Sequence, residues 1–209
     1  MRRRRRGIFL ALEGLDGAGT TTQAHWLAGW LRERGREAHL TAEPSRGPVG
    51  AILRQVLSRR VVGSEGQDFD AGAVALLFAA DRLDHFRSEI EPRLEAGVDV
   101  VSDRYVLSSL AYQAVSTGDI RWVADLNRKA PPADLTLFLG VRPAVALGRR
   151  YAASSDREIY EVPAFQRRVE RAYRRAIRLG RERVVEIPGD RRVEEVSRLV
   201  ARAVERVLR

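Results

Sequence analysis

The sequence predicts an α/β fold in which a five-stranded parallel sheet is covered by helices on both faces. Short apolar segments alternate with longer segments of helical periodicity along the whole chain of 209 residues. No linker or internal repeat divides the chain, and this length suits one domain with a substantial core. We therefore expect a single domain over residues 7–209, preceded by a basic tail over residues 1–6.

The expected strands are short apolar runs, which are typical of strands buried in a parallel sheet. They lie at residues 8–12, 37–42, 98–101, 135–139 and 184–187.

The expected helices show apolar residues at helical spacing, as Leu27, Trp30 and Leu31 do in the first one, where Gly35 provides a stop. They lie at residues 22–36, 48–58, 70–96, 107–115, 120–128, 143–151, 164–179 and 193–208, with loops expected at 63–68 and 152–156.

A glycine-rich loop joins the first expected strand to the first expected helix. The phosphate-binding P-loop pattern is G-x-x-x-x-G-K-[ST]. Gly14, Gly19 and Thr21 match it, whereas Thr20 stands where the lysine belongs. Glycines, including Gly17, let backbone N–H groups point at phosphate oxygens, and the helix N-terminus adds positive charge. The strand and helix on either side favour a fold of the P-loop NTPase type over a glycine-rich turn without chemical meaning.

Polar residues follow three of the expected strands, namely Glu13-Gly14, Glu43-Pro44 and Asp103-Arg104. Ligands of parallel α/β sheets bind beyond the carboxyl ends of the strands, so we expect these segments to converge. An acid beside an arginine suits Mg²⁺ and phosphate respectively. For Asp103 and Arg104 the alternative is a local ion pair that caps the next helix.

The net charge of +9 raises the possibility of nucleic-acid binding. Lys129 is the only lysine, and most arginines are spread along helices beside glutamates, which favours a solvated basic surface. No nucleic-acid-binding motif is present, so binding is expected only as a minor role of the tail block Arg2–Arg6. The chain has no cysteine and no apolar run of about 20 residues, which excludes a disulfide framework and predicts no membrane span. We expect a cytoplasmic protein.

Ordered motifs over nearly the whole chain resemble the thymidylate kinase family. The matching segments are residues 9–23, 41–44, 76–82, 103–113, 127 and 133–136, and the most specific is Asp103-Arg104-Tyr105 followed by Ser108-Ser109-Leu110-Ala111-Tyr112-Gln113. The resemblance implies transfer of the γ-phosphoryl group of ATP to dTMP, Mg²⁺ bound with ATP, a homodimer formed through long helices, and a short lid near residues 149–163.

The resemblance also implies roles for single residues. The catalytic residues are expected to be Arg104, Asp16 and the lid arginines Arg149, Arg150 and Arg157. ATP is expected to contact Gly14, Gly17, Ala18, Gly19, Thr20, Thr21 and Thr22, with Thr21 and Asp103 near the metal. The acceptor nucleotide is expected to contact Asp16, Glu43, Phe78, Arg82, Arg104, Ser109, Tyr112 and Gln113.

The chemistry of these residue types fits those roles. Phe78 is expected to stack on thymine, and Arg82 to donate to a base carbonyl, the alternative being a surface ion pair with Asp81 or Glu89. Tyr112 is expected beneath the deoxyribose, with core packing as the alternative. Ser109 and Gln113 are expected to read the base edge. Asp16 is expected to accept from the sugar 3′-hydroxyl or to lie near Mg²⁺, and Arg104 to bridge the phosphates.

The chain departs from the family pattern at two positions that face phosphate. Thr20 replaces the P-loop lysine and Ala42 replaces an arginine, while Arg46 is a nearby gain. Three interpretations remain open at this point. Another arginine, Arg46 or one from the lid, fills the lysine's place in a working kinase; the protein binds nucleotides with weak or no transfer; or the acceptor nucleotide differs.

Overall fold

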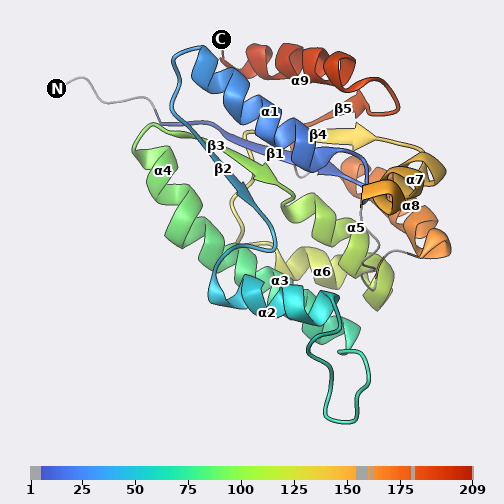
Figure 1. Cartoon of the computed structure of the whole chain (residues 1–209). Coiled ribbons are helices and arrows are strands. Elements are labelled where there is room, and N and C mark those ends of the chain that lie inside the picture. Colours follow the sequence, from blue (N-terminus) through green and yellow to red (C-terminus); the bar gives the residue numbers. More distant parts are fainter. Residues whose placement is uncertain (1–5, 154–159, 161, 180–181, 209) are drawn as a thin grey trace.

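Five strands form one parallel sheet in the order β2-β3-β1-β4-β5 (Figure 1). The computed structural model describes residues 6–153, 160, 162–179 and 182–208. The predicted sheet is confirmed, and every predicted strand overlaps an observed one. The observed strands are β1 (Phe9–Gly14), β2 (Ala38–Ala42), β3 (Asp99–Asp103), β4 (Leu135–Gly140) and β5 (Val184–Pro188).

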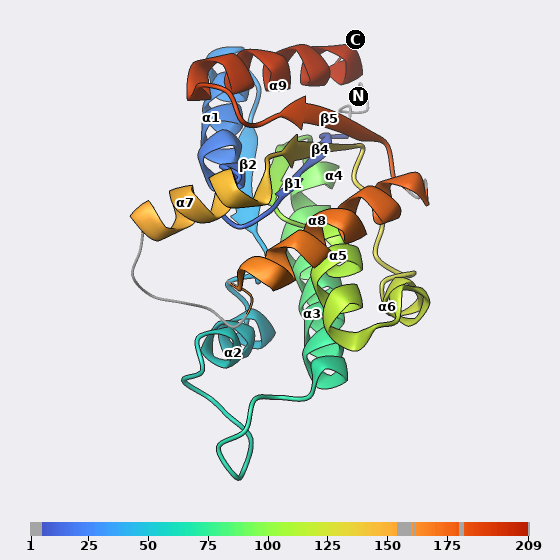
Figure 2. The same cartoon turned by 90° about the vertical axis from the view of Figure 1, so that its right-hand side faces the viewer.

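Helices cover both faces of this sheet, as the sequence predicts. Helices α1 and α9 pack together on one face, while α4 and α5 contact the other, and α8 lies across α5 (Figure 2). The helices are α1 (Thr20–Glu33), α2 (Pro48–Leu57), α3 (Ala71–His85), α4 (Glu91–Glu95), α5 (Val106–Thr117), α6 (Ile120–Leu126), α7 (Pro143–Ala153), α8 (Pro163–Arg178) and α9 (Val193–Leu208). Among these residues, no helix has both the length and the apolar content that a membrane crossing requires.

The long helix predicted over residues 70–96 is continuous but contains a turn of π-helix, η1 (Phe86–Ile90), between α3 and α4. The backbone N–H of Glu91 donates to the carbonyl of Phe86, five residues earlier. Pro92 has no N–H, so the ordinary helical bond to Ser88 cannot form, which favours the wider turn at this place.

Two predicted helix ends are clear in the structure. Gly35 adopts a left-handed conformation and donates to the carbonyl of Arg32, which ends α1 as expected. Helix α7 continues to Ala153, so the loop predicted at 152–156 is wrong in its first two residues. Its remaining residues lie outside the described part of the chain, as do residues 1–5 of the predicted tail.

The strand β1 lies at the centre of the core because its side chains alternate between two apolar clusters. Leu10 and Leu12 pack with Leu27 and other residues of α1. Phe9 and Ala11 pack on the opposite side in a cluster that includes residues of η1. Both faces of β1 are therefore buried, and only its carboxyl end is left to carry polar chemistry.

Candidate active site

The carboxyl ends of β1, β2 and β3 meet at the edge of one large cavity, as the sequence predicts. The backbone N–H of Glu43 donates to the carbonyl of Asp103 at 3.0 Å, and that of Arg104 to the carbonyl of Leu12 at 2.9 Å. The cavity has a volume of about 880 Å³ and is lined by residues 16–23 of the glycine loop, by these strand ends and by parts of α2, α3, α5, α7 and α9.

The glycine loop has the backbone that phosphate binding requires. Gly17 and Gly19 have left-handed φ angles of 84° and 95°. Gly19 is the N-cap of α1 and has no side chain, so no side-chain cap satisfies the N–H groups of the first turn. These donors are therefore left for an anion. Thr20, Thr21 and Thr22, in that first turn, all line the cavity.

Thr21 and Asp103 come together beside the loop. The Thr21 hydroxyl donates to Oδ2 of Asp103 at 2.5 Å. Oδ1 of Asp103 is buried and has no hydrogen-bond partner among the residues that the structure describes. A hydroxyl and a carboxylate with an open oxygen are hard ligands of the kind that Mg²⁺ prefers, so this pair fits the metal expected there.

Arg104 bends back from the end of β3 over the glycine loop. Its φ angle of 76° is left-handed, an unfavourable conformation for a residue with a side chain. One guanidinium nitrogen donates to the carbonyl of Gly14 at 2.8 Å, and the other to Oδ1 of Asp16 at 2.6 Å. Arg104 and Asp103 thus contact different partners across the cavity rather than forming a helix-capping pair.

Arg104 keeps its positive charge in the folded protein. Although burial lowers the pKa of its guanidinium, the nearby Tyr112 and Asp16 raise it well above its usual value. The guanidinium also lies 5.2 Å from the centre of the Tyr112 ring. A permanent cation therefore stands between the glycine loop and the aromatic side of the cavity.

Glu13, which the sequence analysis did not include among the site residues, is joined to Arg104 through two hydroxyl groups. Its carboxylate accepts bonds from the hydroxyl groups of Ser108 at 2.5 Å and of Tyr173 at 3.1 Å. Both hydroxyls also accept from Arg104. Burial raises the pKa of Glu13 to about 7, against the hydrogen bond from Ser108 and the charge of Arg104. The position of Glu13 at a strand end was the available sequence signal.

Helix α8 brings a second residue that sequence reasoning missed. The side-chain amide of Gln166 donates to Oδ2 of Asp16 at 2.9 Å. Gln166 and Tyr173 are seven residues apart, which places them on one face of the helix, and both are buried. Helix α8 therefore contacts both Asp16 and Arg104, although its sequence shows only a basic amphipathic pattern.

The other side of the cavity is aromatic. Phe78, Tyr112 and Gln113 line it together with Pro44 and Leu57. The Tyr112 hydroxyl accepts from the backbone N–H of Asp16 at 3.1 Å, and its ring packs against neighbouring aromatic rings. Tyr112 thus belongs to the core and to the cavity at once. A flat apolar wall with a few polar groups is typical of a site for a base.

Arg82 and Ser109 lie behind this wall and do not line the cavity. The guanidinium of Arg82 is buried and faces Glu43, Ser109, Asn127 and the carbonyl of Tyr105. These contacts engage all three of its nitrogens. The surface ion pair considered for Arg82 is therefore wrong, and a direct contact with a base would require these bonds to break.

Several arginines line the cavity: Arg54 of α2, Arg104 after β3, Arg149 and Arg150 of α7, and Arg191 and Arg192 before α9. Arg149 donates to the carbonyl of Gly189 at 2.9 Å, which ties α7 to the segment before α9. Arg46, considered as a replacement for the lysine, is exposed and lies outside the lining. Arg157 lies outside the described residues.

Comparison with known proteins identifies the family of this chain. The family model described as thymidylate kinase matches residues 12–200. A putative thymidylate kinase of Aeropyrum pernix is 42% identical over 200 residues, which cover 95% of this chain and 91% of that protein. The chain belongs to the thymidylate kinase family. A probable thymidylate kinase of Thermococcus kodakarensis is 42% identical over 168 residues, covering 79% and 82% of the two chains. One of Pyrobaculum aerophilum is 36% identical over 201 residues, covering 96% and 98%.

The two positions at which the sequence analysis expects a departure from the family pattern both lie at the cavity. Thr20 is buried in the first turn of α1, and Ala42 ends β2; both line the cavity. Neither supplies a cation. Among the residues that the structure describes, the cationic side chains that line the cavity are therefore arginines, from α2, from α7, from the end of β3 and from the segment before α9.

Proposed function

We propose that this chain transfers the γ-phosphoryl group of ATP to dTMP. The observation that carries the proposal is the placement of Arg104, held at once by Gly14 and Asp16 of the glycine loop and beside the Tyr112 ring. Arg104 thus lies between the glycine loop, where we place ATP, and the Tyr112 ring, where we place dTMP. A cation there contacts the phosphates of both nucleotides when the two nucleotides meet end to end. The names of the relatives favour dTMP over another acceptor.

Positioning and charge supply the catalysis in this proposal. Phosphoryl transfer spreads negative charge over the equatorial oxygens, and fixed cations stabilise that charge without moving. Arg104 is fixed by hydrogen bonds and stays charged, so it fits this role. The N–H groups at the start of α1 hold the triphosphate, and Phe78 and Tyr112 hold the base. No general base is needed.

Thr21 and Asp103 are the residues that would hold Mg²⁺ with ATP. When bound, the ion neutralises charge on the phosphate oxygens. Asp16 serves a different need: because its carboxylate is engaged by Arg104 and Gln166, it orients Arg104 rather than facing the metal in this arrangement.

The test is a coupled ADP-release assay with ATP, Mg²⁺ and dTMP, with other nucleoside monophosphates run in parallel. Turnover with dTMP by the natural protein supports the proposal and indicates that another cation has taken over the role of the lysine. The variants Arg149→Ala, Arg150→Ala, Arg191→Ala and Arg192→Ala then identify it by the largest fall in kcat. Binding of dTMP without turnover, together with recovery in Thr20→Lys, would instead indicate a nucleotide-binding protein disabled in its P-loop.

We further propose a homodimer formed through α2 and α3, and a cytoplasmic location. The two helices pack together, and each exposes a large apolar side chain: Ile52 is 47% and Leu76 is 52% exposed. Light scattering on the natural protein and on Leu76→Glu tests this: the natural protein is expected at twice the chain mass, and the variant at the chain mass.

A further inference from the structure

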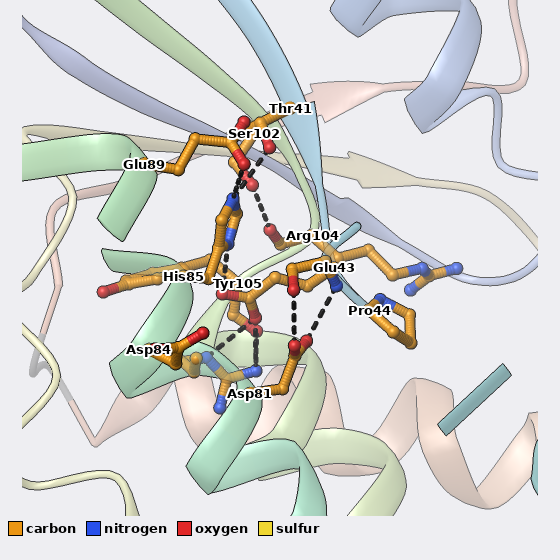
Figure 3. A network of polar contacts seen from close by, with 12 residues as sticks. Thr41, Glu43, Pro44, Asp81, Asp84, His85, Glu89, Ser102, Arg104 and Tyr105 are labelled. Carbon is orange, nitrogen blue, oxygen red and sulfur yellow. Dashed lines mark hydrogen bonds and ion pairs between the residues drawn. The ribbon is translucent and has the colours of Figure 1, made fainter. Parts of the chain in front are cut away.

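A chain of polar contacts runs from the surface to the floor of the cavity, through a histidine that the proposed function does not use. His85 ends α3, and its side chain is fully buried. Figure 3 shows its ring between Glu43 on one side and Thr41 and Glu89 on the other. Glu89 in turn lies 2.7 Å from Nε2 of His39, a partly exposed residue.

Three side chains of α3 together hold the end of β2. Asp81 accepts from the backbone N–H of Ser45 at 2.7 Å and from its hydroxyl at 2.5 Å. Arg82 donates to Oε2 of Glu43 at 2.9 Å. His85 takes the remaining oxygen, since its Nδ1 lies 3.3 Å from Oε1 of Glu43. Side chains of α3 therefore contact both oxygens of the Glu43 carboxylate and orient it.

The chemistry of the contacts determines which nitrogen of His85 carries a proton. Glu43 forms a buried ion pair with the guanidinium of Arg82, and a carboxylate oxygen accepts, so Nδ1 of His85 is the donor toward it. The Thr41 hydroxyl lies 2.7 Å from Nε2 and can donate to that nitrogen or accept from it. Nδ1–H therefore faces Glu43 whether the ring is neutral or protonated.

The Nε2 side of the His85 ring, which faces away from Glu43, also has polar partners. Although burial raises the pKa of Glu89, its hydrogen bonds with His39 and Thr41 lower it below its usual value. Glu89 is thus a carboxylate, with Oε2 at 3.8 Å from Nε2 of His85. His85 directly precedes the π-helical turn Phe86–Ile90, and Glu89 lies within it. Turns of this kind are found often at functional sites.

We propose that His85 is a positioning residue, which holds the carboxylate of Glu43 in the orientation that the acceptor nucleotide requires. Glu43 lines the cavity beside Pro44, Phe78 and Arg104, on the side that we assign to dTMP. His85 itself does not reach the cavity. Its effect therefore passes through Glu43, and it acts on acceptor binding rather than on ATP. This inference rests on the proposed function.

The experiment compares His85→Asn with His85→Gln. The amide of asparagine can take the place of Nδ1, whereas that of glutamine reaches toward Nε2 and loses the bond to Glu43. Loss of a hydrogen bond to a charged group is expected to raise the KM for dTMP about tenfold in His85→Gln, with kcat and the KM for ATP nearly unchanged. His85→Asn is expected to keep a KM for dTMP close to the natural value.

A second variant tests the contact on the Nε2 side of the His85 ring. Thr41→Val keeps the shape of the side chain and removes the hydroxyl that meets Nε2. It is expected to raise the KM for dTMP by about threefold, because the ring loses one of its two hydrogen bonds. Arg87→Ala, which removes an exposed pair with Glu91 on the same helical stretch, is the matched control and should leave both KM values unchanged.

Titration calorimetry with dTMP alone separates this inference from the proposed function. A natural protein that binds dTMP but shows no turnover overturns the proposed function, while weaker dTMP binding in His85→Gln than in His85→Asn still supports the role of His85. Equal dTMP affinity in these two variants overturns it. So does a parallel loss of ATP binding and thermal stability in every His85 variant, which indicates a purely structural histidine.

Discussion

At the scale of single residues, the site depends on charged groups whose partners are set by burial. Arg104 adopts a left-handed backbone conformation, which is unfavourable for a side-chain-bearing residue, and its guanidinium is held by Gly14 and Asp16. Strain of this kind persists only where surrounding contacts enforce it, and it is frequent at active sites. The geometry of the guanidinium fork, and not charge alone, is therefore expected to matter.

Replacing Arg104 by lysine tests this expectation. Arg104→Lys keeps the charge but cannot donate to Gly14 and Asp16 from two nitrogens at once. We expect kcat to fall about 10²–10³-fold, measured in the ADP-release assay. Arg174→Ala, which removes an exposed pair with Glu170, serves as the control. A kcat within a few-fold of the natural value in a folded Arg104→Lys protein would contradict the role given to Arg104.

Glu13 gives a prediction about pH. Its pKa is about 7 in the folded protein and near 4.5 when exposed, so the folded state binds this proton more tightly than the unfolded state does. The free energy of unfolding should therefore fall as pH rises from 4.5 to 7, by about 3 kcal/mol from this group.

The variant Glu13→Gln removes that titration while keeping the side-chain shape. Urea unfolding at pH 5 and pH 8 measures both proteins. The stability of the natural protein relative to the variant is expected to be lower at pH 8 than at pH 5. An unchanged difference between the two pH values would mean that Glu13 does not carry a raised pKa.

At the scale of elements, the glycine loop and α7 touch backbone to backbone. A Cβ atom at Gly17 would lie 2.1 Å from the carbonyl oxygen of Ala146, whereas one at Gly19 meets nothing within 4 Å. Both glycines have left-handed φ angles. The loop thus sets the position of α7, which carries the cavity residues Arg149 and Arg150.

The pair Gly17→Ala and Gly19→Ala separates this contact from backbone strain. Both variants carry the strain, of order 1–3 kcal/mol, but only Gly17→Ala must also displace α7. We expect Gly17→Ala to weaken ATP binding more than Gly19→Ala does, by at least about tenfold in a calorimetric titration. Equal effects would show that α7 does not depend on this contact.

At the scale of the whole molecule, one cavity is built from segments that lie far apart in the chain. Residues of the glycine loop, of the β2 and β3 ends and of α5, α7 and α9 line it together. A ligand that binds this cavity binds only the folded state, so it must stabilise the fold by mass action.

Thermal unfolding with dTMP measures that linkage. At a dTMP concentration of about 100 Kd, the stabilisation is about 2.7 kcal/mol, which corresponds to a rise in Tm of roughly 5–10 °C for a chain of this size. His85→Gln should show a smaller rise than His85→Asn at the same dTMP concentration. A Tm that does not respond to dTMP at any concentration would contradict acceptor binding in this cavity.

The fold and the glycine loop could be predicted from the sequence alone, because both produce local signals. Apolar runs and helical periodicity report burial directly, so the five strands and the convergence of the strand ends at Glu13, Glu43 and Asp103 were predicted correctly. Of the residues predicted to bind ATP, 17–22 line the cavity because they form one continuous loop and helix start, whereas Gly14 does not line it.

The pairing of side chains from separate elements could not be predicted from the sequence and became clear from the folded structure. These pairs join residues that are dozens of positions apart in the chain. Arg82 and His85 contact Glu43, and the hydroxyls of Ser108 and Tyr173 connect Arg104 to Glu13. A sequence pattern indicates which face of an element is buried, but not which polar group of another element meets it there. That choice depends on how helices such as α3 and α8 pack on the sheet, where burial requires each polar group to find a partner.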